Sequence, residues 1–230
     1  MHAITVKQPW AQAIAQFGKD VENRTRRPPT DLIGSRIAIH VGQATDAWCD
    51  AWRAWVTNGA QQAEHLKPLL MWATDPRRPG YRQAMRRTES GPRLMVPVPE
   101  AVPNAGRIVA TARLIGAVSR GEDGRVVGIP PYTSPYLVCD SPWFTGPFGW
   151  VLADVIALPD PVGARCTWPE PGGTCPGPHT TIVGRIPITG CANCGGSGVL
   201  PIRGQVYPFQ IDLDVRAEVW RQEALARGAA

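Results

Sequence analysis

Four polar residues near the start of the chain could together bind a flat, hydrogen-bonding ligand. They are Lys19, Glu22, Asn23 and Arg24, which fall within a single turn. Lysine and arginine donate hydrogen bonds to phosphates, carbonyls and ring nitrogens. Glutamate and asparagine can pair with an exocyclic amine or with the Watson–Crick edge of a base. The turn is therefore a candidate nucleotide site, and its simpler alternative is an ion-pair network that only pins the turn.

Aromatic residues could supply a stacking surface for such a base. Each aromatic ring that stacks on a base contributes about 1–3 kcal/mol. The candidates are Trp10, before the turn, and Trp143 or Trp150 in the second half of the chain. The predicted ligand-binding residues are Trp10, Lys19, Glu22, Asn23, Arg24, His40, Trp143 and Trp150. If the protein is an enzyme, Lys19 and Glu22 are the predicted catalytic pair, and acid–base work would require them to be buried.

A second group of chemically capable residues lies in segment 166–202. Of its 37 residues, 14 are glycine or proline and only Glu170 and Arg185 are charged, so it cannot bury much apolar surface. Cys191 and Cys194 have the spacing of a zinc knuckle. A structural Zn²⁺ would replace the missing core, because such segments fold when metal binds. A redox Cys-x-x-Cys is the alternative, but it needs a βαβ context that this sequence lacks.

Two sets of residues could complete this metal site. Cys175 and His179 would give three thiolates and one imidazole, and we favour this set because its spacing is tighter. Cys166 is the alternative ligand; paired with Cys175, it would give an all-thiolate site.

Composition places the chain among folded, soluble proteins. Its 230 residues are 43% hydrophobic and 19% charged, and the net charge is +5. The basic balance favours an anionic partner such as RNA, DNA or a nucleotide. We find no signal peptide and no apolar run long enough to span a membrane, so we expect a cytoplasmic monomer without a membrane partner.

The elements that must position these residues form an α+β pattern, in which strands outnumber helices and no regular βαβ units occur. The sequence predicts strands over residues 3–6, 36–41, 107–118, 148–158 and 205–213, and a strand or extended loop over 20–25. It predicts helices over residues 11–17, 44–56, 61–72 and 215–226, the last capped by Asp214.

Two of these segments have open alternatives. Trp48, Trp52 and Trp55 share one face of the second helix, where they either pack in the core or stack on bases. The Arg/Pro-rich stretch 74–103 is interpreted as a long loop, either a solvated insertion or an arm that contacts phosphates.

Several motifs resemble the ASCH domain family of the PUA-like superfamily. The resemblance rests on Gln8-Pro9-Trp10-Ala11, on Gly18-Lys19-Asp20-Val21-Glu22-Asn23-Arg24, on Ile39-His40, on Cys139-Asp140-Ser141-Pro142-Trp143 and on Gly149-Trp150-Val151-Leu152. Pro161-Val162 and Arg203-Gly204-Gln205 fit more loosely. On this basis residues 1–165 with 203–230 form one ASCH-like domain, and 166–202 form a zinc-ribbon-like insertion.

The resemblance implies a small curved β-barrel with a cleft between its strands and first helices. Members of the superfamily mostly bind RNA or recognise modified bases in RNA or DNA, and a few ASCH proteins are N4-acetylcytidine hydrolases or nucleases. Those hydrolases carry a threonine three residues after the lysine, where this chain has Glu22. We therefore expect a binding module, with a hydrolase of modified nucleosides or a ribonuclease as the alternative.

The metal site gives the first prediction. Elemental analysis of the purified protein should find one zinc per chain, and Cys191→Ser with Cys194→Ser should remove it, because two thiolate ligands are lost. Cys49→Ser, in the predicted second helix, is the control and should leave the zinc in place. Metal-free protein whose Cys191 and Cys194 react freely with thiol reagents would contradict the prediction.

Overall fold

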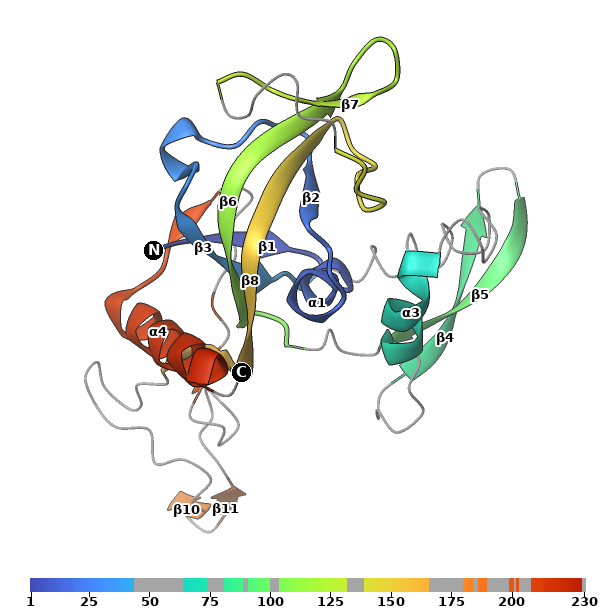
Figure 1. Ribbon diagram of the computed structural model, residues 1–230. Helices are drawn as coiled ribbons and strands as arrows, with labels where there is room; N and C mark the ends of the chain where they lie inside the picture. Colours follow the sequence, from blue (N-terminus) through green and yellow to red (C-terminus); the bar gives the residue numbers. More distant parts are fainter. Residues whose placement is uncertain are drawn as a thin grey trace.

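The computed structural model builds the chain around one mixed β-sheet (Figure 1). It describes residues 1–43, 64–73, 81–88, 91–99, 104–131, 139–165, 180–183, 186–189, 199–200, 202 and 208–228. No helix among these residues is both long and apolar enough to cross a membrane.

Within the described residues the sheet has seven strands in the order β13-β1-β3-β6-β8-β2, with β7 paired to β6. Only β1 and β3 run parallel to each other, and the other pairs are antiparallel. The strands are β1 (His2–Val6), β2 (Val21–Arg24), β3 (Arg36–Val41), β6 (Ile108–Arg120), β7 (Val126–Gly128), β8 (Phe148–Val162) and β13 (Phe209–Gln210). The predicted α+β class is confirmed.

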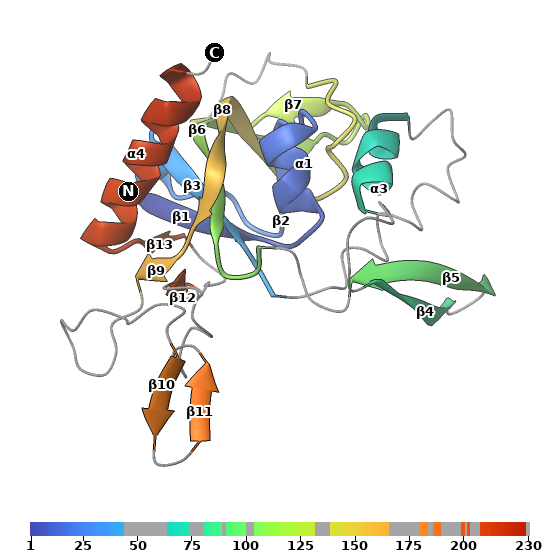
Figure 2. The same ribbon diagram turned by 90° about the horizontal axis from the view of Figure 1, so that it is seen from below.

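One helix covers each face of this sheet (Figures 1 and 2). Because side chains alternate along a strand, β3 divides its residues between two cores. Ile37 and Ile39 pack in the cluster that includes α1 (Trp10–Gln16), whereas Ala38 packs in the cluster that includes α4 (Leu213–Gly228).

The residues that bound α1 explain why this short helix forms. The Gln8 side chain is fully buried, and its Oε1 accepts a hydrogen bond from the Gln12 amide at 3.1 Å, which satisfies one free N–H of the first turn. At the other end Gly18 has φ +69°, a conformation that costs glycine little. The Lys19 amide then bonds back to the Ala13 carbonyl at 3.1 Å, as in a Schellman motif.

An ion-pair network holds α4 against the sheet. Glu223 is buried and lies between Arg36 of β3, at 3.2 Å, and Arg227, at 3.0 Å. Arg36 also pairs with Asp154 of β8. The buried carboxylate of Glu223 thus receives charge-assisted hydrogen bonding from its own helix and from the sheet.

A close approach of side chains fixes Gly149 at the start of β8. A Cβ at this position would lie 2.5 Å from the Val21 side chain, 2.7 Å from Phe144 and 2.8 Å from Val118. These three residues form a small core between β2, β6 and the loop 139–147. Any larger residue at 149 would force this core apart.

Two sequence interpretations were wrong. The stretch 74–103 is not simply a loop, because β4 (Tyr81–Thr88) and β5 (Gly91–Pro99) pair within it as an antiparallel hairpin. Asp214 does not cap the last helix, because α4 begins one residue earlier and places Asp214 in its first turn. There the carboxylate favours the helix through the macrodipole instead.

Other predictions are confirmed in part or lie outside the described residues. The helix expected at 61–72 appears as η2 (Glu64–Leu66) followed by α3 (Lys67–Ala73). Of the strand expected at 205–213, the described part contains β13. The helix at 44–56 and every predicted metal ligand lie outside the described residues.

Four further short strands flank or lie within the predicted insertion. β9 (Ala164–Arg165) pairs with β12 (Val199–Leu200), so the chain leaves and re-enters the main domain at adjacent points. Between them β10 (Thr180–Val183) pairs with β11 (Ile186–Thr189). The domain boundaries themselves stay a prediction.

Burial of His40 on β3 predicts a pH-dependent stability. Desolvation lowers the pKa of this imidazole below 6.5. The imidazole therefore binds a proton less readily in the folded protein than in the unfolded chain. Stability should therefore fall as pH drops below 6.5. Urea unfolding at several pH values should show a shallower fall for His40→Gln than for the wild type. His2→Gln, a control at the start of β1, should keep the wild-type profile; equal profiles for all three proteins would contradict the prediction.

Candidate functional site

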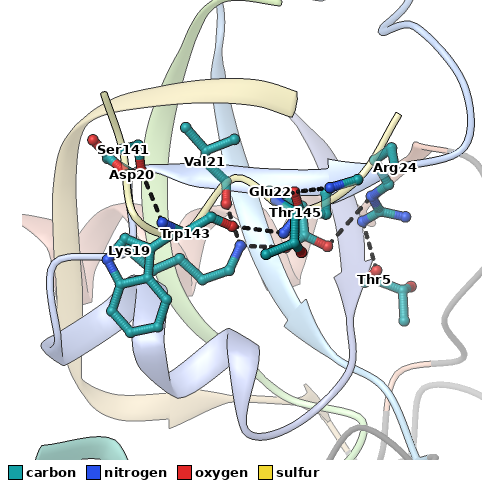
Figure 3. A network of polar contacts seen from close by, with 11 residues as sticks. Thr5, Lys19, Asp20, Val21, Glu22, Arg24, Ser141, Trp143 and Thr145 are labelled. Atoms are coloured by element: carbon teal, nitrogen blue, oxygen red, sulfur yellow. Dashed lines mark hydrogen bonds and ion pairs between the residues drawn. The ribbon is translucent and has the colours of Figure 1, made fainter. Parts of the chain in front are cut away.

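Lys19 is the most buried charged residue of the predicted site. The turn after α1 directs its side chain inward, where only 2% of the residue is exposed. The ammonium donates to Glu22 Oε2 at 2.8 Å and to the Val21 carbonyl (Figure 3). Removing an ammonium from water is costly unless it is paired and hydrogen-bonded, and both conditions are met here.

Glu22 lies between two cations. It sits on β2 opposite Trp150 of β8, on the face that carries α1, and is 7% exposed. One carboxylate oxygen binds Lys19, and the other, Oε1, lies 3.5 Å from Arg24 Nε. Glu22 therefore accepts contacts from a cation on each side.

Arg24 joins this carboxylate to the far part of the sheet. Its Nη2 donates to the Thr5 carbonyl of β1 at 2.7 Å, and its guanidinium lies over the Trp150 ring at 5.4 Å. Its Nε is buried and has no hydrogen-bond partner among the described residues, since the contact with Glu22 is long. Arg24 therefore brings β2, at one edge of the sheet, into contact with β1, near the other edge.

Asn23 uses its side chain to hold a loop. Its Nδ2 donates to the Trp143 carbonyl at 2.8 Å, and its Oδ1 accepts from the amides of Thr145 at 2.9 Å and Gly146 at 3.0 Å. Successive residues of a strand point to opposite faces, so Asn23 points away from Glu22. The structure thus separates Asn23 from the Lys19, Glu22 and Arg24 cluster.

The side chain of Trp143 extends past the edge of β2 and contacts α1. Its ring is 6% exposed and stands edge-to-face with Trp10, at 6.4 Å between centroids, and with His65 of η2, at 4.6 Å. The same loop is tied to the Lys19 turn by a hydrogen bond from Ser141 to Asp20 (Figure 3). Trp143 is therefore enclosed by other rings, whereas Trp10 is only partly buried.

Three of these contacts were missed by sequence reasoning. His65 lies beside Trp143 although nothing in its local sequence marks it as an aromatic partner. Gln8 was noted only as part of a motif, yet its buried amide caps α1. Ser141 was likewise part of a motif, and its bond to Asp20 has no local signal.

His40 is placed on the other face of the sheet. Its Nε2 contacts the Ile202 carbonyl at 2.9 Å, its Nδ1 contacts the Thr5 hydroxyl at 3.2 Å, and its ring meets Phe209 at 5.5 Å. It is 1% exposed and shares the face of Ala38, toward α4. His40 therefore does not join the Glu22 cluster.

A cavity of about 750 Å³ lies between the end of β8 and α4. Its polar lining residues are Arg107, Asp160, Asp214, Glu218, Arg221 and Gln222. None of the predicted ligand-binding residues lines it. Within the cluster the side chain of Arg24 is the most exposed, at 19%, against 10% for Glu22 and 2% for Lys19.

The described residues contain no group of three or more His, Cys, Asp or Glu side chains placed to hold a metal ion. Cys139 is a free thiol beside the small core of Val21 and Phe144. The predicted zinc ligands lie outside the described residues, so the zinc site stays a prediction.

The comparisons with protein families and with curated proteins identify no relative of this chain. No protein-family model matches the chain. The curated proteins contain no significant match either.

The buried pair predicts strong thermodynamic coupling. Lys19→Met or Glu22→Gln alone should lower the free energy of unfolding by about 3–5 kcal/mol, because each leaves the other group without its charged partner. The double variant should cost clearly less than the sum of the two. Urea unfolding monitored by tryptophan fluorescence measures all three.

An exposed pair of the same residue types is the control. Lys67 and Glu64 lie 3.5 Å apart with more than half of each side chain exposed. Lys67→Met and Glu64→Gln should each change stability by about 1 kcal/mol or less. Additive and equally small effects at both pairs would contradict the assigned role of Lys19.

Proposed function

We propose that this protein binds an unpaired nucleobase, in RNA, DNA or a free nucleotide, at the edge formed by Glu22 and Arg24. The proposal rests on one observation, which is that a hydrogen-bond donor without a partner lies beside a hydrogen-bond acceptor. Arg24 Nε has a buried hydrogen without an acceptor among the described residues, and Glu22 Oε1 lies 3.5 Å away. A buried donor left unpaired costs about 1–3 kcal/mol, which a ligand acceptor would recover.

The chemistry of this edge favours a base that carries an amino group. Cytosine and adenine each present a ring-nitrogen acceptor next to an exocyclic amine on their Watson–Crick edges. The ring nitrogen would accept from Arg24 Nε, and the amine would donate to Glu22 Oε1. Lys19 binds the other carboxylate oxygen, which orients Glu22.

The surrounding rings and the sheet support the same proposal. Trp10 is partly buried at the start of α1 and is the ring that we assign to base stacking. The bond from Arg24 to Thr5 brings the two ends of the sheet together, which supports the small, curved, PUA-like barrel that the ASCH resemblance implies. The net charge of +5 favours a phosphate-bearing ligand.

A hydrolase of acylated nucleosides is the second candidate, and the burial of the Lys19–Glu22 pair favours it. In that reaction Glu22 would take a proton from water while the water oxygen bonds to the acyl carbon. The bond from that carbon to the exocyclic nitrogen would then break. The leaving amine would take a proton from Lys19, and Glu22 would return its proton to Lys19.

Binding of single-stranded oligonucleotides and mononucleotides tests the proposal. Fluorescence titration with CMP, AMP, UMP and GMP should show tighter binding of CMP or AMP, because only these present the matching edge. Arg24→Lys should weaken that binding at least tenfold, since it keeps the charge but removes Nε. Arg113→Lys, at an exposed position of β6, should bind like the wild type.

Two results would contradict the binding proposal. The first is an Arg24→Lys protein that binds as tightly as the wild type. The second is a folded wild-type protein that binds neither nucleotides nor oligonucleotides. Release of acetate from N4-acetylcytidine that stops in Glu22→Gln, with affinity retained, would favour the hydrolase.

A further inference from the structure

We infer that the cavity between α4 and the end of β8 binds a basic amino acid, which is a zwitterion with a second cation on an aliphatic stem. The cavity measures about 750 Å³, within the range of small-molecule sites. It is formed where β6 begins, where β8 ends and along the first turns of α4 (Figure 2). Its described lining includes no residue of the proposed base site, so the inference does not depend on the proposed function.

One wall of the cavity consists of side chains that bind one another. Glu218 accepts two hydrogen bonds from Arg221, at 2.6 and 2.8 Å, and one from Gln222 at 3.0 Å. These hydrogen bonds, chiefly those from Arg221, lower the pKa of the Glu218 carboxyl to about 2, so the group is ionised and pairs with Arg221. The buried Gln222 also accepts from the Asp160 amide at 3.2 Å, which fixes the end of β8 against α4. This wall is therefore formed without a ligand.

Three other charged side chains of the lining have no ion-pair partner among the described residues. Two of them are the carboxylates of Asp160 and Asp214. The third is the guanidinium of Arg107, whose Nη1 lies 3.5 Å from the Pro161 carbonyl, a contact that leaves its charge uncompensated. The lining thus presents two carboxylates and one guanidinium to a ligand.

The charge of this lining has the opposite sign to that of the protein. The chain has a net charge of +5, whereas the cavity is lined by three carboxylates and two guanidinium groups. A concave surface that carries an excess of one charge concentrates ligands of the opposite charge. The excess of carboxylates therefore favours a ligand with more cationic than anionic groups.

The remaining lining suits an aliphatic stem. Val162 and Val215 are buried and belong to the core beneath α4. Lysine and arginine lay their methylene groups on such apolar surface while the charged end reaches polar groups. As free amino acids they carry two cations and one carboxylate, which is the complement of the three unpaired groups. The α-carboxylate would bind Arg107, and the two cations would bind Asp160 and Asp214.

Calorimetric titration of the full chain with L-lysine, L-arginine and L-norleucine tests the inference. Lysine or arginine should bind with a Kd below about 1 mM. Norleucine, which lacks the side-chain cation, should bind at least tenfold more weakly. Asp160→Asn with Asp214→Asn should weaken lysine binding at least tenfold, whereas Asp31→Asn, at an exposed position of η1, should bind like the wild type.

Cadaverine, which is lysine without its carboxylate, tests the role of Arg107. Arg107→Gln should weaken lysine binding at least tenfold and leave cadaverine binding unchanged, because only lysine carries the group that Arg107 binds. Retained cadaverine binding also shows that this variant is folded. Arg113→Gln, at an exposed position of β6, is the matched control and should change neither affinity.

Four results would overturn the inference. The first is the absence of saturable binding of lysine and arginine up to about 10 mM. The second is equal loss of lysine and cadaverine affinity in Arg107→Gln. The third is binding of Ca²⁺ that is lost in the double aspartate variant while lysine does not bind, which would indicate a metal site. The fourth is Nα-acetyl-lysine that binds as tightly as lysine, which would indicate the C-terminal lysine of a peptide. Arg24→Lys should leave lysine binding unchanged, so failure of the base site would not affect this one.

Discussion

The burial of one ammonium group is the constraint on which the rest of the structure depends. Lys19 can be buried only because its ammonium donates hydrogen bonds to Glu22 and to the Val21 carbonyl. Both acceptors belong to the two residues that begin β2. The turn after α1, the first residues of β2 and the orientation of the Glu22 carboxylate are therefore fixed together. Arg24 extends the same series of polar contacts to the Thr5 carbonyl, and so links this turn to β1.

The side chains of the short strand β2 make polar contacts on both faces of the sheet. Glu22 and Arg24 point toward α1, where their charges are concentrated, while Asn23 points to the other face and holds the loop 139–147 with three hydrogen bonds. That loop carries Trp143 back around the strand to Trp10. The proposed ligand site and the contacts that support it therefore come from one short strand, which accounts for the density of polar residues in the motif.

Local physical chemistry predicted much of the fold but little of the assembled site. The limits of β3, the helix stop at Gly18 and the α+β class follow from periodicity and glycine conformation, which are local properties. The β4–β5 hairpin escaped prediction because arginine and proline obscure its alternation, and its pairing depends on a cross-strand register.

The same distinction between local and long-range signals applies to the candidate site. The cluster of Lys19, Glu22 and Arg24 was visible because its members are close in sequence. Whether His40 joins this cluster depends on the face of β3 that it occupies. The contact of Trp143 with His65 depends on how distant segments of the chain pack together.

The bond from Arg24 to Thr5 has a mechanical consequence. Within the described residues, β2 and β1 are joined by this side chain and not by a ladder of backbone hydrogen bonds. A hydrogen bond to a charged group contributes about 1.5–3 kcal/mol, far less than a whole strand pairing. The link between β1 and β2 is therefore a side-chain contact, and it lies directly beside Glu22. A side-chain contact of this size can break while every strand pairing in the sheet is kept, so β1 and β2 are held to each other less firmly than paired neighbours are.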